Sequence, residues 1–509
     1  MKEGALHELP GGWLWTKLGD IIEVIRGASP RPKGDPRYFG GNIPWIMISD
    51  ISRQYGKYIS RTRDTVTEEG AKRSRYLKTG TLILSNSGTV CVPKILAVDG
   101  CIHDGFVAFP EVNSELETLF LYHYFHFIRP EIIQKNRQGI TQVNLNTNIV
   151  KSIEIPLPPL PEQRAIVSKI EQLFSDLDNG IENFKKAQAQ LKLYRQSVLK
   201  AACEGKLVPT EAELARAEGR DYEAADVLLA RILEERREKW NGKGKFKEPD
   251  APDTSGLPKQ PEGWGWATLE QLSWDSGYGT SEKCDYNFSG PPVLRIPNIN
   301  EGRINLNNIK YASESTNLNE TESLVYGDML VIRTNGSKDL IGRAGAVTQN
   351  FNKPYFFASY LIRFRIVEFG GLPIWLSSIW QTLRIRSWIE SFAATSAGQY
   401  NISMSTLNKL PLELPPLAEQ RRIVAEVERR LSVCDKMEEI ISESLQKAES
   451  LRQSILKKAF EGKLLNKKEL EKARNAPDWE PAEKLLERIR QEKQIKEKNN
   501  KPARRRTHG

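Results

Sequence analysis

Polar side chains that bind phosphates or match base edges gather in glycine- and proline-rich loops in two separate stretches of the chain. Lysine and arginine neutralise phosphates regardless of sequence, whereas arginine forms paired hydrogen bonds with guanine, and asparagine or glutamine with adenine. The first set is Arg26, Ser29, Arg31, Lys33, Tyr38, Arg53, Asn86, Arg137, Gln142 and Asn144. The second set is Tyr278, Thr280, Ser281, Lys283, Arg295, Asn298, Arg333, Asn335, Lys338, Arg343, Gln399 and Asn401. For any one of these residues a solvated loop position is an equally good explanation, so the argument depends on the elements around them.

No motif of catalysis accompanies these loops. The sequence has no G-x-x-x-x-G-K-[ST] phosphate loop, no H-E-x-x-H and no G-x-S-x-G turn. Residues 290–293 lack the amide and the aromatic of an amino-methyltransferase motif, and no acidic set with a lysine marks a nuclease. His123 and His126 have ligand-like spacing but lie in an aromatic run without a third ligand, which favours a structural role. We therefore predict no catalytic residue and no metal site in this chain.

The elements that must position these loops are duplicated along the chain. Residues 158–164 (PPLPEQR) and 415–421 (PPLAEQR) are nearly identical and are separated by 421 − 164 = 257 residues. A period this long indicates two copies of a domain with its connector rather than a solenoid of short repeats. Three further matches support the duplication: 195–200 with 452–457 and 204–207 with 461–464 at the same shift, and 10–15 with 261–266 at a shift of 264 − 13 = 251.

Each repeated stretch predicts one long helix. From Ile166 and from Ile423 onward, apolar residues recur three and four positions apart with charged or amide residues between them, as in a coiled coil. Prolines precede each pattern, and Gly205 and Gly462 follow it, as at helix ends. About 40 helical residues extend about 60 Å and cannot bury their apolar stripe alone. We expect the two helices to pair antiparallel around a pseudo-two-fold axis; the alternative is that each packs only on its own globular domain.

The predicted fold class is α+β, with two mixed α/β domains joined by these antiparallel helices. Short β-branched and aromatic runs separated by glycine, asparagine and serine turns indicate much sheet in both globular parts. The expected boundaries are 1–157 for the first domain, 158–207 for the first long helix, 208–260 for a linker with an amphipathic helix, 261–414 for the second domain, 415–465 for the second long helix and 466–509 for a charged C-terminal segment.

Composition limits the class of protein. The net charge of +9 (74 basic and 65 acidic residues) and the pI near 9.0 favour a polyanionic partner. Five cysteines without a C-x-x-C pair argue against a disulfide framework or structural zinc and fit a reducing cytoplasm. No apolar run suggests a signal peptide or membrane span. The charged end from Gln491 is expected to be disordered.

These residues resemble a known family. The entry P-P-L-x-E-Q-R-x-I-V at 158–167 and 415–424, and the exit R-Q-S-x-L-K with E-G-K-L at 195–207 and 452–464, are similar to the repeats of type I restriction-modification specificity subunits. The resemblance covers nearly the whole chain. Gly279-Thr280-Ser281-x-Lys283 resembles a common loop of the family's target-recognition domains, and we find no such loop in the first copy.

The resemblance implies a noncatalytic subunit that reads double-stranded DNA with two target-recognition domains. It implies that this chain binds no cofactor itself. Two modification subunits with S-adenosylmethionine would methylate adenine N6, and two restriction subunits with ATP and Mg²⁺ would cleave DNA. Because the polar loop residues differ between the copies, the two half-sites are expected to differ.

Two other interpretations stay open on the sequence alone. One is a single-chain modification or restriction enzyme with a degenerate active site, which binding of S-adenosylmethionine by the isolated chain would support. The other is a coiled-coil scaffold, or a specificity module, for a partner other than nucleic acid. Polyanion binding that shows no sequence preference, with the modification partner present, would support it.

Overall fold

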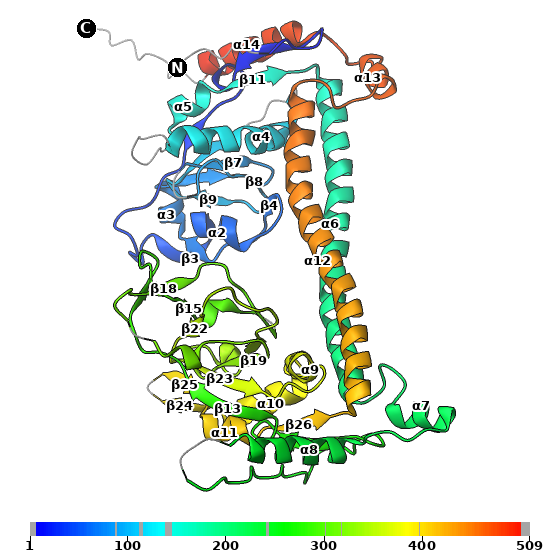
Figure 1. Cartoon of the computed structure of the whole chain (residues 1–509). Coiled ribbons are helices and arrows are strands. Elements are labelled where there is room, and N and C mark those ends of the chain that lie inside the picture. The colour runs from blue at the N-terminus through cyan, green and yellow to red at the C-terminus, as the bar shows by residue number, and fades with distance from the viewer. Residues whose placement is uncertain are drawn as a thin grey trace, which may run out of the picture. The chain divides into compact units, whose positions relative to one another are not determined.

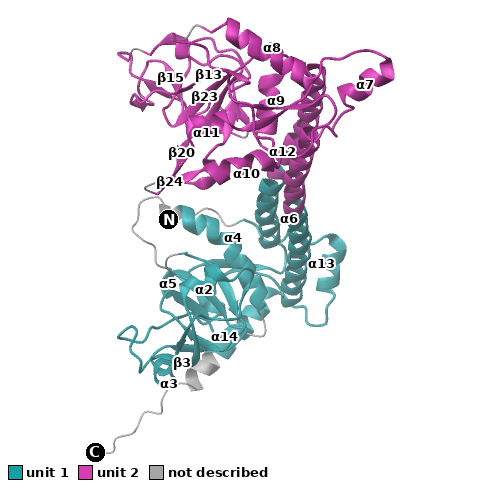
Figure 2. Cartoon of the chain, turned by 90° about the horizontal axis from the view of Figure 1, so that it is seen from below, with its two compact units in different colours: residues 1–184, 443–509 teal, residues 185–442 magenta. Residues whose placement is uncertain are grey.

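The computed structural model describes residues 7–86, 89–110, 116–137, 145–240, 244–300, 302–316, 318–396 and 398–499. The chain divides into two compact units, shown in Figure 2: unit 1 holds residues 1–184 and 443–509, and unit 2 holds residues 185–442. The division falls inside both long helices. Each unit therefore contains one globular domain together with part of each repeated helix.

The globular domain of unit 1 contains two mixed sheets, with strand orders β2-β10-β7-β8-β4 and β5-β3-β9-β6. Their hydrophobic strand residues and the aromatic face of α4 form the core, in which Phe106, Phe109, Phe120 and Phe125 are fully buried. The strands are β1 (Leu14–Lys17), β2 (Ile25–Arg26), β3 (Phe39–Ile46), β4 (Tyr58–Ile59), β5 (Asp64–Val66), β6 (Arg75–Leu77), β7 (Leu82–Ser85), β8 (Pro93–Leu96), β9 (Gly100–Ile102), β10 (Phe106–Phe109) and β11 (Glu154–Leu157). The helices are α1 (Leu18–Ile21), α2 (Ile48–Arg53), α3 (Glu68–Lys72), α4 (Thr118–Arg137) and α5 (Thr147–Lys151).

Besides the β12-β26 pair, the described residues of the globular domain of unit 2 form three sheets, with strand orders β13-β23-β19-β21-β17-β16, β14-β18-β15-β22 and β20-β25-β24. Its strands are β12 (Gly265–Thr268), β13 (Ser273–Tyr278), β14 (Cys284–Asp285), β15 (Pro292–Leu294), β16 (Ile299–Asn300), β17 (Gly302–Ile304), β18 (Lys310–Ala312), β19 (Asp328–Ile332), β20 (Thr334–Asn335), β21 (Ala344–Ala346), β22 (Phe356–Phe357), β23 (Leu361–Ile366), β24 (Ala394–Ser396), β25 (Gln399–Asn401) and β26 (Pro411–Leu414). Helices α9 (Leu372–Ile379), α10 (Leu383–Phe392) and α11 (Met404–Asn408) and three short 3-10 turns complete it.

In both domains the first and last strands form a ladder that brings the chain ends together. Strand β1 pairs antiparallel with β11, with Leu14 opposite Leu157, and β12 pairs with β26, with Gly265 opposite Leu414. These partners are copies of one another, because 14 + 251 = 265 and 157 + 257 = 414. The long helix of each repeat follows the ladder directly, so the ladder fixes each globular domain to the start of its helix.

The two long helices, α6 (Leu160–Cys203) and α12 (Leu417–Phe460), pair antiparallel within each unit (Figure 1). In unit 1, Ile166 and Ile170 near the start of α6 share a core with Ile455 and Ala459 near the end of α12. In unit 2 the opposite ends meet, because residues 198–202 share a core with residues 423–427. The predicted antiparallel pairing is confirmed, and the alternative of helices that pack only on their own domains is wrong.

Two ion pairs across the helices are copies of each other. In unit 2, Arg195 Nη2 lies 2.6 Å from Asp435 Oδ1, and in unit 1 Arg452 pairs with Asp178. Adding 257 to Arg195 and Asp178 gives Arg452 and Asp435, so each pair exchanges the helix that supplies the cation. This exchange is what a pseudo-two-fold repeat predicts.

The glutamate of each P-P-L-x-E-Q-R entry is a buried anchor rather than a surface charge. Glu162 Oε2 accepts from Trp13 Nε1 at 2.7 Å, and its Oε1 accepts from Trp479 Nε1 at 3.0 Å and Arg474 Nε at 3.2 Å. A buried carboxylate needs such donors to offset the loss of hydration. Glu162 therefore joins the start of the first domain, the first long helix and the C-terminal segment.

The second copy uses the same anchor with one equivalent donor, because Trp264 is the copy of Trp13, and one different donor. Glu419 Oε1 accepts from Trp264 Nε1 at 2.9 Å, and its Oε2 accepts from the Glu211 backbone N–H at 2.8 Å. Burial raises the pKa of Glu419. The neighbouring glutamines also match: Gln163 Nε2 donates to Pro158 O at 3.0 Å, and Gln420 Nε2 donates to Pro415 O at 2.8 Å.

The segments after the two long helices are also copies. Helices α7 (Glu211–Glu218) and α8 (Ala225–Glu238) follow α6, and α13 (Lys467–Arg474) and α14 (Ala482–Asn499) follow α12. Both α7 and α13 begin with a capping box, at Thr210 and at Asn466. The expected disorder from Gln491 is wrong as far as Asn499, because α14 continues to that residue after burying Leu485 in the core of unit 1. Residues 500–509 lie outside the described part of the chain.

Candidate nucleic-acid interface

In unit 1, four of the predicted contact residues converge on Asp104, a residue that the sequence analysis missed. Ser29 Oγ donates to Asp104 Oδ1 at 2.9 Å, and Arg31 Nη2 lies 3.8 Å from Asp104 Oδ2. Arg26 Nε and Asn86 Nδ2 both donate to Asp104 O at 3.2 Å. The carboxylate and carbonyl of one turn thus hold together residues from β2, the loop after it and the end of β7.

This cluster keeps its cationic groups in solvent. Arg26, Arg31 and Lys33 are exposed, and Arg31 retains 72% of its side-chain surface. His103 lies beside them; burial lowers its pKa, and the nearby cations lower it further. The result is a positively charged loop tip whose base is tied to the sheet.

A second exposed segment of unit 1 lies at the far edge of the same sheet. Arg53 is exposed at the end of α2, and the next residues lead to β4, the edge strand opposite β2 in the sheet order. Tyr55 in this segment is 99% exposed and was not predicted. Arg53 is therefore available for contact but is not part of the Asp104 cluster.

In unit 2 an aromatic-cation pair takes the place of the Asp104 cluster. The Arg333 guanidinium lies 4.5 Å from the centroid of the Tyr278 ring, and Tyr278 keeps 46% of its surface exposed. Thr280 follows in the same loop, where its backbone N–H donates to Phe357 O at 2.8 Å. Ser281 and Lys283 lie exposed further along the loop.

The small sheet β20-β25-β24 adds the amide residues of unit 2. Asn401 stands opposite Thr334 in the ladder, and Thr334 Oγ1 donates to Gln399 Oε1 at 3.3 Å. Asn335 Oδ1 accepts from the Ser337 backbone N–H at 2.8 Å, which orders the turn that carries Lys338. The predicted residues of β20, β25 and this turn are therefore neighbours.

Two predicted arginines of unit 2 are tied to the protein. Arg295 Nη2 donates to Asn308 O at 2.8 Å and its guanidinium lies 5.5 Å from the Tyr286 ring centroid. Arg343 is exposed, and its Nε donates to Asp339 O at 2.9 Å. Both keep part of their guanidinium group for other partners, but each has a structural bond as well.

Three predicted contacts are corrected by the structure. Tyr38, Asn86 and Asn298 retain 2%, 2% and 0% of their surface. Tyr38 packs under Arg73, whose guanidinium lies 4.6 Å from the ring centroid. Asn298 Nδ2 donates to two loop carbonyls, those of Asn305 and Asn307, both at 2.9 Å. These side chains hold loops in place from inside, so we remove them from the proposed contact set.

The loop that the sequence analysis found only in the second copy has a counterpart in the first. A Cβ on Gly27 would lie 2.1 Å from His103 O, and a Cβ on Gly279 would lie 2.1 Å from Phe357 O, so both positions require glycine. Each glycine opens a Gly-x-Ser-x-cation sequence, with Ser29 before Arg31 and Ser281 before Lys283. The Gly-Thr-Ser-x-Lys sequence itself is absent from the first copy, but an equivalent loop stands in its place.

Some predictions lie outside the described residues. Gln142 and Asn144 belong to 138–144, and of Arg137 only the backbone, at the end of α4, is described. Their places in the contact set stay predictions.

The two histidines of α4 have structural surroundings. His123 Nε2 lies 2.7 Å from Glu171 Oε1 on α6, and the His126 ring packs edge to face on Tyr122. Burial lowers the pKa of His126 to about 4. Within the described ranges no group of three or more His, Cys, Asp or Glu residues has the geometry of a metal site. No helix in the part of the chain that is described is both long and apolar enough to cross a membrane.

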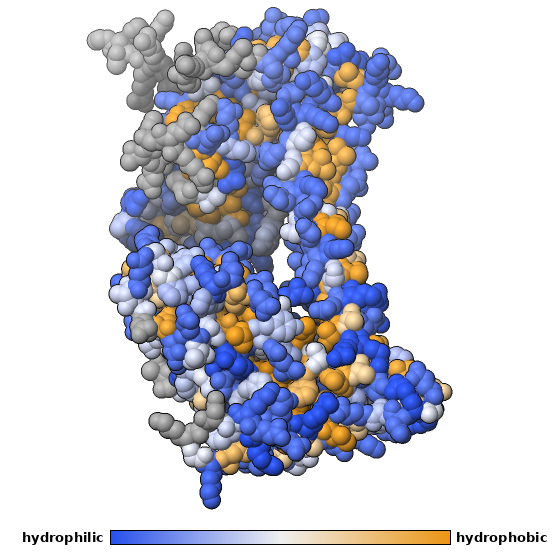
Figure 3. Space-filling model, in the orientation of Figure 1, coloured by the Kyte–Doolittle hydropathy of each residue, from blue (hydrophilic) through white to orange (hydrophobic). Residues whose placement is uncertain are grey.

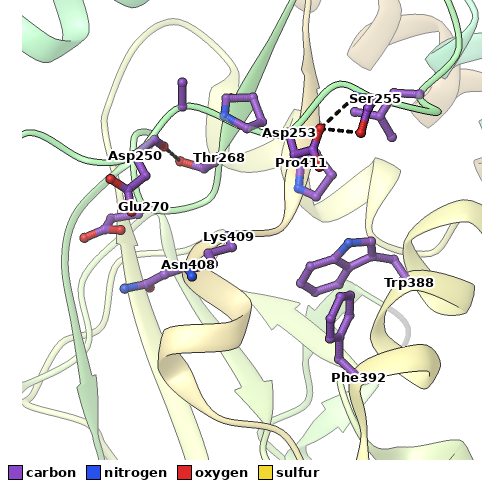
Figure 4. Close-up of a pocket in the computed structure, with 13 residues that line it drawn as sticks. Asp250, Asp253, Ser255, Thr268, Glu270, Trp388, Phe392, Asn408, Lys409 and Pro411 are labelled. Carbon is purple, nitrogen blue, oxygen red and sulfur yellow. Dashed lines mark hydrogen bonds between the residues drawn. The ribbon is translucent and has the colours of Figure 1, made fainter.

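A cavity of about 490 Å³ in unit 2 lies away from the predicted contact residues (Figure 4). In the close-up, Trp388 and Phe392 of α10 face the linker that carries Asp253 and Ser255. None of the predicted contact residues lines it, so we assign it no part in nucleic-acid binding. Its lining residues are Asp250, Ala251, Pro252, Asp253, Ser255, Leu257, Thr268, Glu270, Trp388, Phe392, Asn408, Lys409 and Pro411.

Comparison with known proteins finds one group of similar proteins. Residues 10–188 match the family model described as the type I restriction modification DNA specificity domain. The chain is 26% identical to the type I restriction enzyme EcoKI specificity subunit of Escherichia coli K12, with 96% of each chain covered. It is 25% identical to the StySPI specificity subunit of Salmonella potsdam, covering 96% of this chain and 97% of that one. The chain is similar over nearly its whole length to type I restriction-modification specificity subunits.

Solved structures agree with this fold. One, reported as the structural basis of complex assembly and conformational transition of the type I R-M system, superposes with a TM-score of 0.63 at 19% identity, covering 90% of this chain and 100% of that one. The HsdS subunit of Thermoanaerobacter tengcongensis gives a TM-score of 0.52 at 21% identity, covering 91% and 100%. These two structures share the fold of this chain, and the named relatives are specificity subunits.

Proposed function

We propose that this chain is a specificity subunit that reads an asymmetric bipartite target in double-stranded DNA, one half-site with each recognition domain. The observation that carries the proposal is the pair of polar clusters at equivalent places in the two domains. Asp104 organises Arg26, Ser29 and Arg31 in the first, and Tyr278 stacks with Arg333 in the second. One frame with two different sets of side chains suits two different base sequences.

The same proposal assigns catalysis to partner subunits. Two modification subunits would hold S-adenosylmethionine and methylate adenine N6, and two restriction subunits would hold ATP and Mg²⁺ and cleave DNA. The long helices are the proposed docking surface for the modification subunits. On α12 in unit 2, Val433, Met437 and Ile440 are 51%, 47% and 61% exposed, at spacings that place them on one flank. Figure 3 shows further apolar residues along the surface formed by the helix pair.

Methylome sequencing of cells that carry the intact system tests the reading function. We expect methylated adenines only within a two-part sequence whose halves differ, and loss of all of them when the gene for this chain is removed. Methylation that persists without this chain, or that has no sequence preference, would contradict the proposal. Binding of S-adenosylmethionine by the isolated chain would revive an enzymatic role.

Charge placed on the apolar flank of α12 tests the docking surface. Met437→Glu combined with Ile440→Glu should leave helix content unchanged but prevent co-purification of the modification subunit, because two carboxylates would be buried without partners. Lys436→Glu introduces the same charge at an exposed position of the same helix turn and serves as the control. Normal assembly of the double variant would place the docking surface elsewhere.

A further inference from the structure

One pair of amides is retained in both recognition domains although most of the surrounding loop residues differ. Gln142-x-Asn144 in the first domain corresponds to Gln399-x-Asn401 in the second, since 142 + 257 = 399. This is the shift that relates the repeated helices. Together with the serine of the first loop, Ser29 and Ser281, this pair is the part of the polar set that the duplication has kept unchanged in residue type and spacing.

Described residues next to this pair confirm the alignment of the two domains. Leu145, which follows Asn144, donates its N–H to Asn86 O at 3.2 Å, and Ile402, which follows Asn401, donates its N–H to Arg333 O at 2.9 Å. The next residues, Asn146 and Ser403, cap helices α5 and α11 in the same way. The equivalence of the two amide pairs thus rests on matching hydrogen bonds as well as on sequence.

In the second domain the amides share one accessible face of a strand. Alternate residues of a strand point to the same side, so Gln399 and Asn401 lie together and Tyr400 faces the opposite way. Tyr400 is half-buried against the core of unit 2. Gln399 is exposed, Asn401 is half-buried, and Thr334 stands directly opposite Asn401 in the neighbouring strand. The hydrogen bond from Thr334 to Gln399 uses only one of the four hydrogen-bonding positions of that amide.

The residues beside this face are the ones that differ between the domains. Tyr278 precedes Gly279, and Arg26 precedes the equivalent Gly27. Arg333 donates its backbone N–H to Tyr360 O at 3.0 Å, and Asn86 donates its backbone N–H to Gly105 O at 2.9 Å, which makes them equivalent as well. In the second domain, the stacked pair of Tyr278 and Arg333 therefore occupies the positions of Arg26 and Asn86 in the first domain. Arg26 and Asn86 are instead both bonded to Asp104 O.

Two readers of unlike sequences still share one requirement. If the modification subunits methylate adenine in each half-site, an A·T pair at the methylated position is common to both. An amide both donates and accepts, which matches the N6 and N7 edge of adenine, or the unpaired edge of thymine once adenine is extruded for methylation. A phosphate only accepts hydrogen bonds, and Lys or Arg serves it better.

We propose that Gln399 and Asn401 contact the A·T pair whose adenine is methylated, whereas Tyr278 and Arg333 read the bases particular to the second half-site. This inference rests on the proposed function above. It divides the contact set of each domain into a constant part and a variable part, and it gives each part a different base pair.

Binding of the complex of this chain with its modification subunits, at fixed salt, tests the division. The duplexes keep the first half-site intact and carry single base-pair changes in the second. The unaltered complex should prefer A·T over G·C at the methylated position by about 10- to 100-fold, the discrimination expected of a good bidentate contact. Asn401→Ala or Gln399→Ala should reduce this preference to a few-fold and leave discrimination at the other positions intact.

The variable residues should behave in the opposite way. Tyr278→Ala or Arg333→Ala should relax other positions of the second half-site and preserve the preference for A·T at the methylated one. Gln349→Ala removes an exposed amide beyond the Asp328 end of strand β19, away from the cluster, and should change nothing. Equal weakening on every duplex by the Asn401 and Gln399 variants would overturn the inference and indicate a phosphate or structural role.

Altered DNA tests the same contact without altering the protein. A contact with the paired adenine should be lost with 7-deazaadenine, which lacks N7, whereas a contact with the freed thymine should persist when the adenine is replaced by an abasic site. If the complex binds both altered duplexes and a G·C duplex as tightly as the original, the inference about Gln399 and Asn401 is wrong. The proposed recognition of a base sequence would still hold. If the complex prefers no sequence at all, the proposed function itself fails.

Discussion

The two recognition domains share a frame and differ where the frame meets solvent. In both, a glycine that cannot carry a Cβ opens the first loop, at Gly27 and Gly279. In unit 1 the neighbouring side chains gather around the carboxylate of Asp104, whereas in unit 2 Arg333 stacks on Tyr278. The glycines are fixed by backbone contacts inside the fold, and the side chains beside them are not. Positions under steric constraint have therefore stayed alike, while most of the exposed loop positions diverged.

In the long helices, by contrast, the side-chain contacts are repeated in both copies. Their ion pairs, Arg195 with Asp435 and Arg452 with Asp178, are copies of each other, and so are the buried anchors Glu162 and Glu419. Each of these groups contacts a partner that is itself repeated, so a change on one side leaves the other without its bond. The constant part of the molecule is the part whose residues depend on one another.

The largest expected effect comes from shortening the two long helices. Deleting one matched heptad from each helix, residues 180–186 and 437–443, keeps the apolar seam in phase. If the helices set the distance between the half-sites, this distance decreases by about 10 Å in the shortened variant. That is about three base pairs and about 100° of turn around the duplex. Methylome sequencing should show a shorter gap between unchanged half-sites, or no methylation at all. Methylation at the original spacing by an assembled variant would show that the helices do not set the gap.

A smaller effect, confined to one domain, is expected at Asp104. Asp104→Ala removes the acceptor that fixes Ser29 and pairs with Arg31, so the first loop loses its preorganisation. We expect binding to weaken about 10-fold, the equivalent of one charge-assisted hydrogen bond, with relaxed preference in the first half-site only. Asp99→Ala, which removes an exposed ion pair with Lys78 elsewhere in unit 1, is the control. Relaxation of the second half-site would break the proposed independence of the domains.

The smallest effect concerns the stability of unit 1 and its dependence on pH. The hydrogen bond from His123, followed by that from Lys57, lowers the pKa of Glu171 to about 2. Because the folded pKa lies below that of the unfolded chain, near 4.5, the stabilisation is present above pH 4.5 and is lost as the pH falls toward 2.

Glu171→Gln should lower the free energy of unfolding of unit 1 by about 1–2 kcal/mol at pH 7, less than the full pKa shift implies because solvent reaches a third of the side chain. Hydrogen exchange of α4 at pH 7, and urea unfolding at pH 7 and pH 3, measure the effect. Glu428→Gln, at the equivalent exposed position of α12, should change little. If Glu171→Gln and Glu428→Gln lowered the stability equally, the two units would not differ in this contact.

Periodicity was sufficient to predict the helices, their antiparallel pairing and the mixed domains, because a coiled-coil seam repeats every seven residues in any context. The prediction failed at the C-terminus. The charge of residues 491–499 suggested disorder, although Leu485 and Ile489, four residues apart in the same helix, pack α14 against the core. Local sequence cannot show that a helix gains stability from a surface 474 residues away in the chain, such as the Gly19 carbonyl to which Lys493 Nζ donates.

The contact residues were harder to predict than the fold. Composition located Ser29 and Arg31 but not Asp104, because an acidic residue is not expected among phosphate contacts. It also included Tyr38 and Asn298, since residue type does not reveal whether a polar side chain points inward. The sequence does not show why Gly27 and Gly279 are both required, because the reason is a backbone carbonyl that approaches each glycine, and the two loops share only a glycine, a serine and a cation.

The claim that each domain reads its own half-site is tested most directly by making the two domains identical. Replacing residues 263–412 with a copy of residues 12–155, while both long helices are kept, removes the difference between the loops and preserves the frame. Methylome sequencing of cells with this variant and its modification subunit should then show a site that is an inverted repeat of the first half-site. Recovery of the original asymmetric site from the same cells would contradict the account.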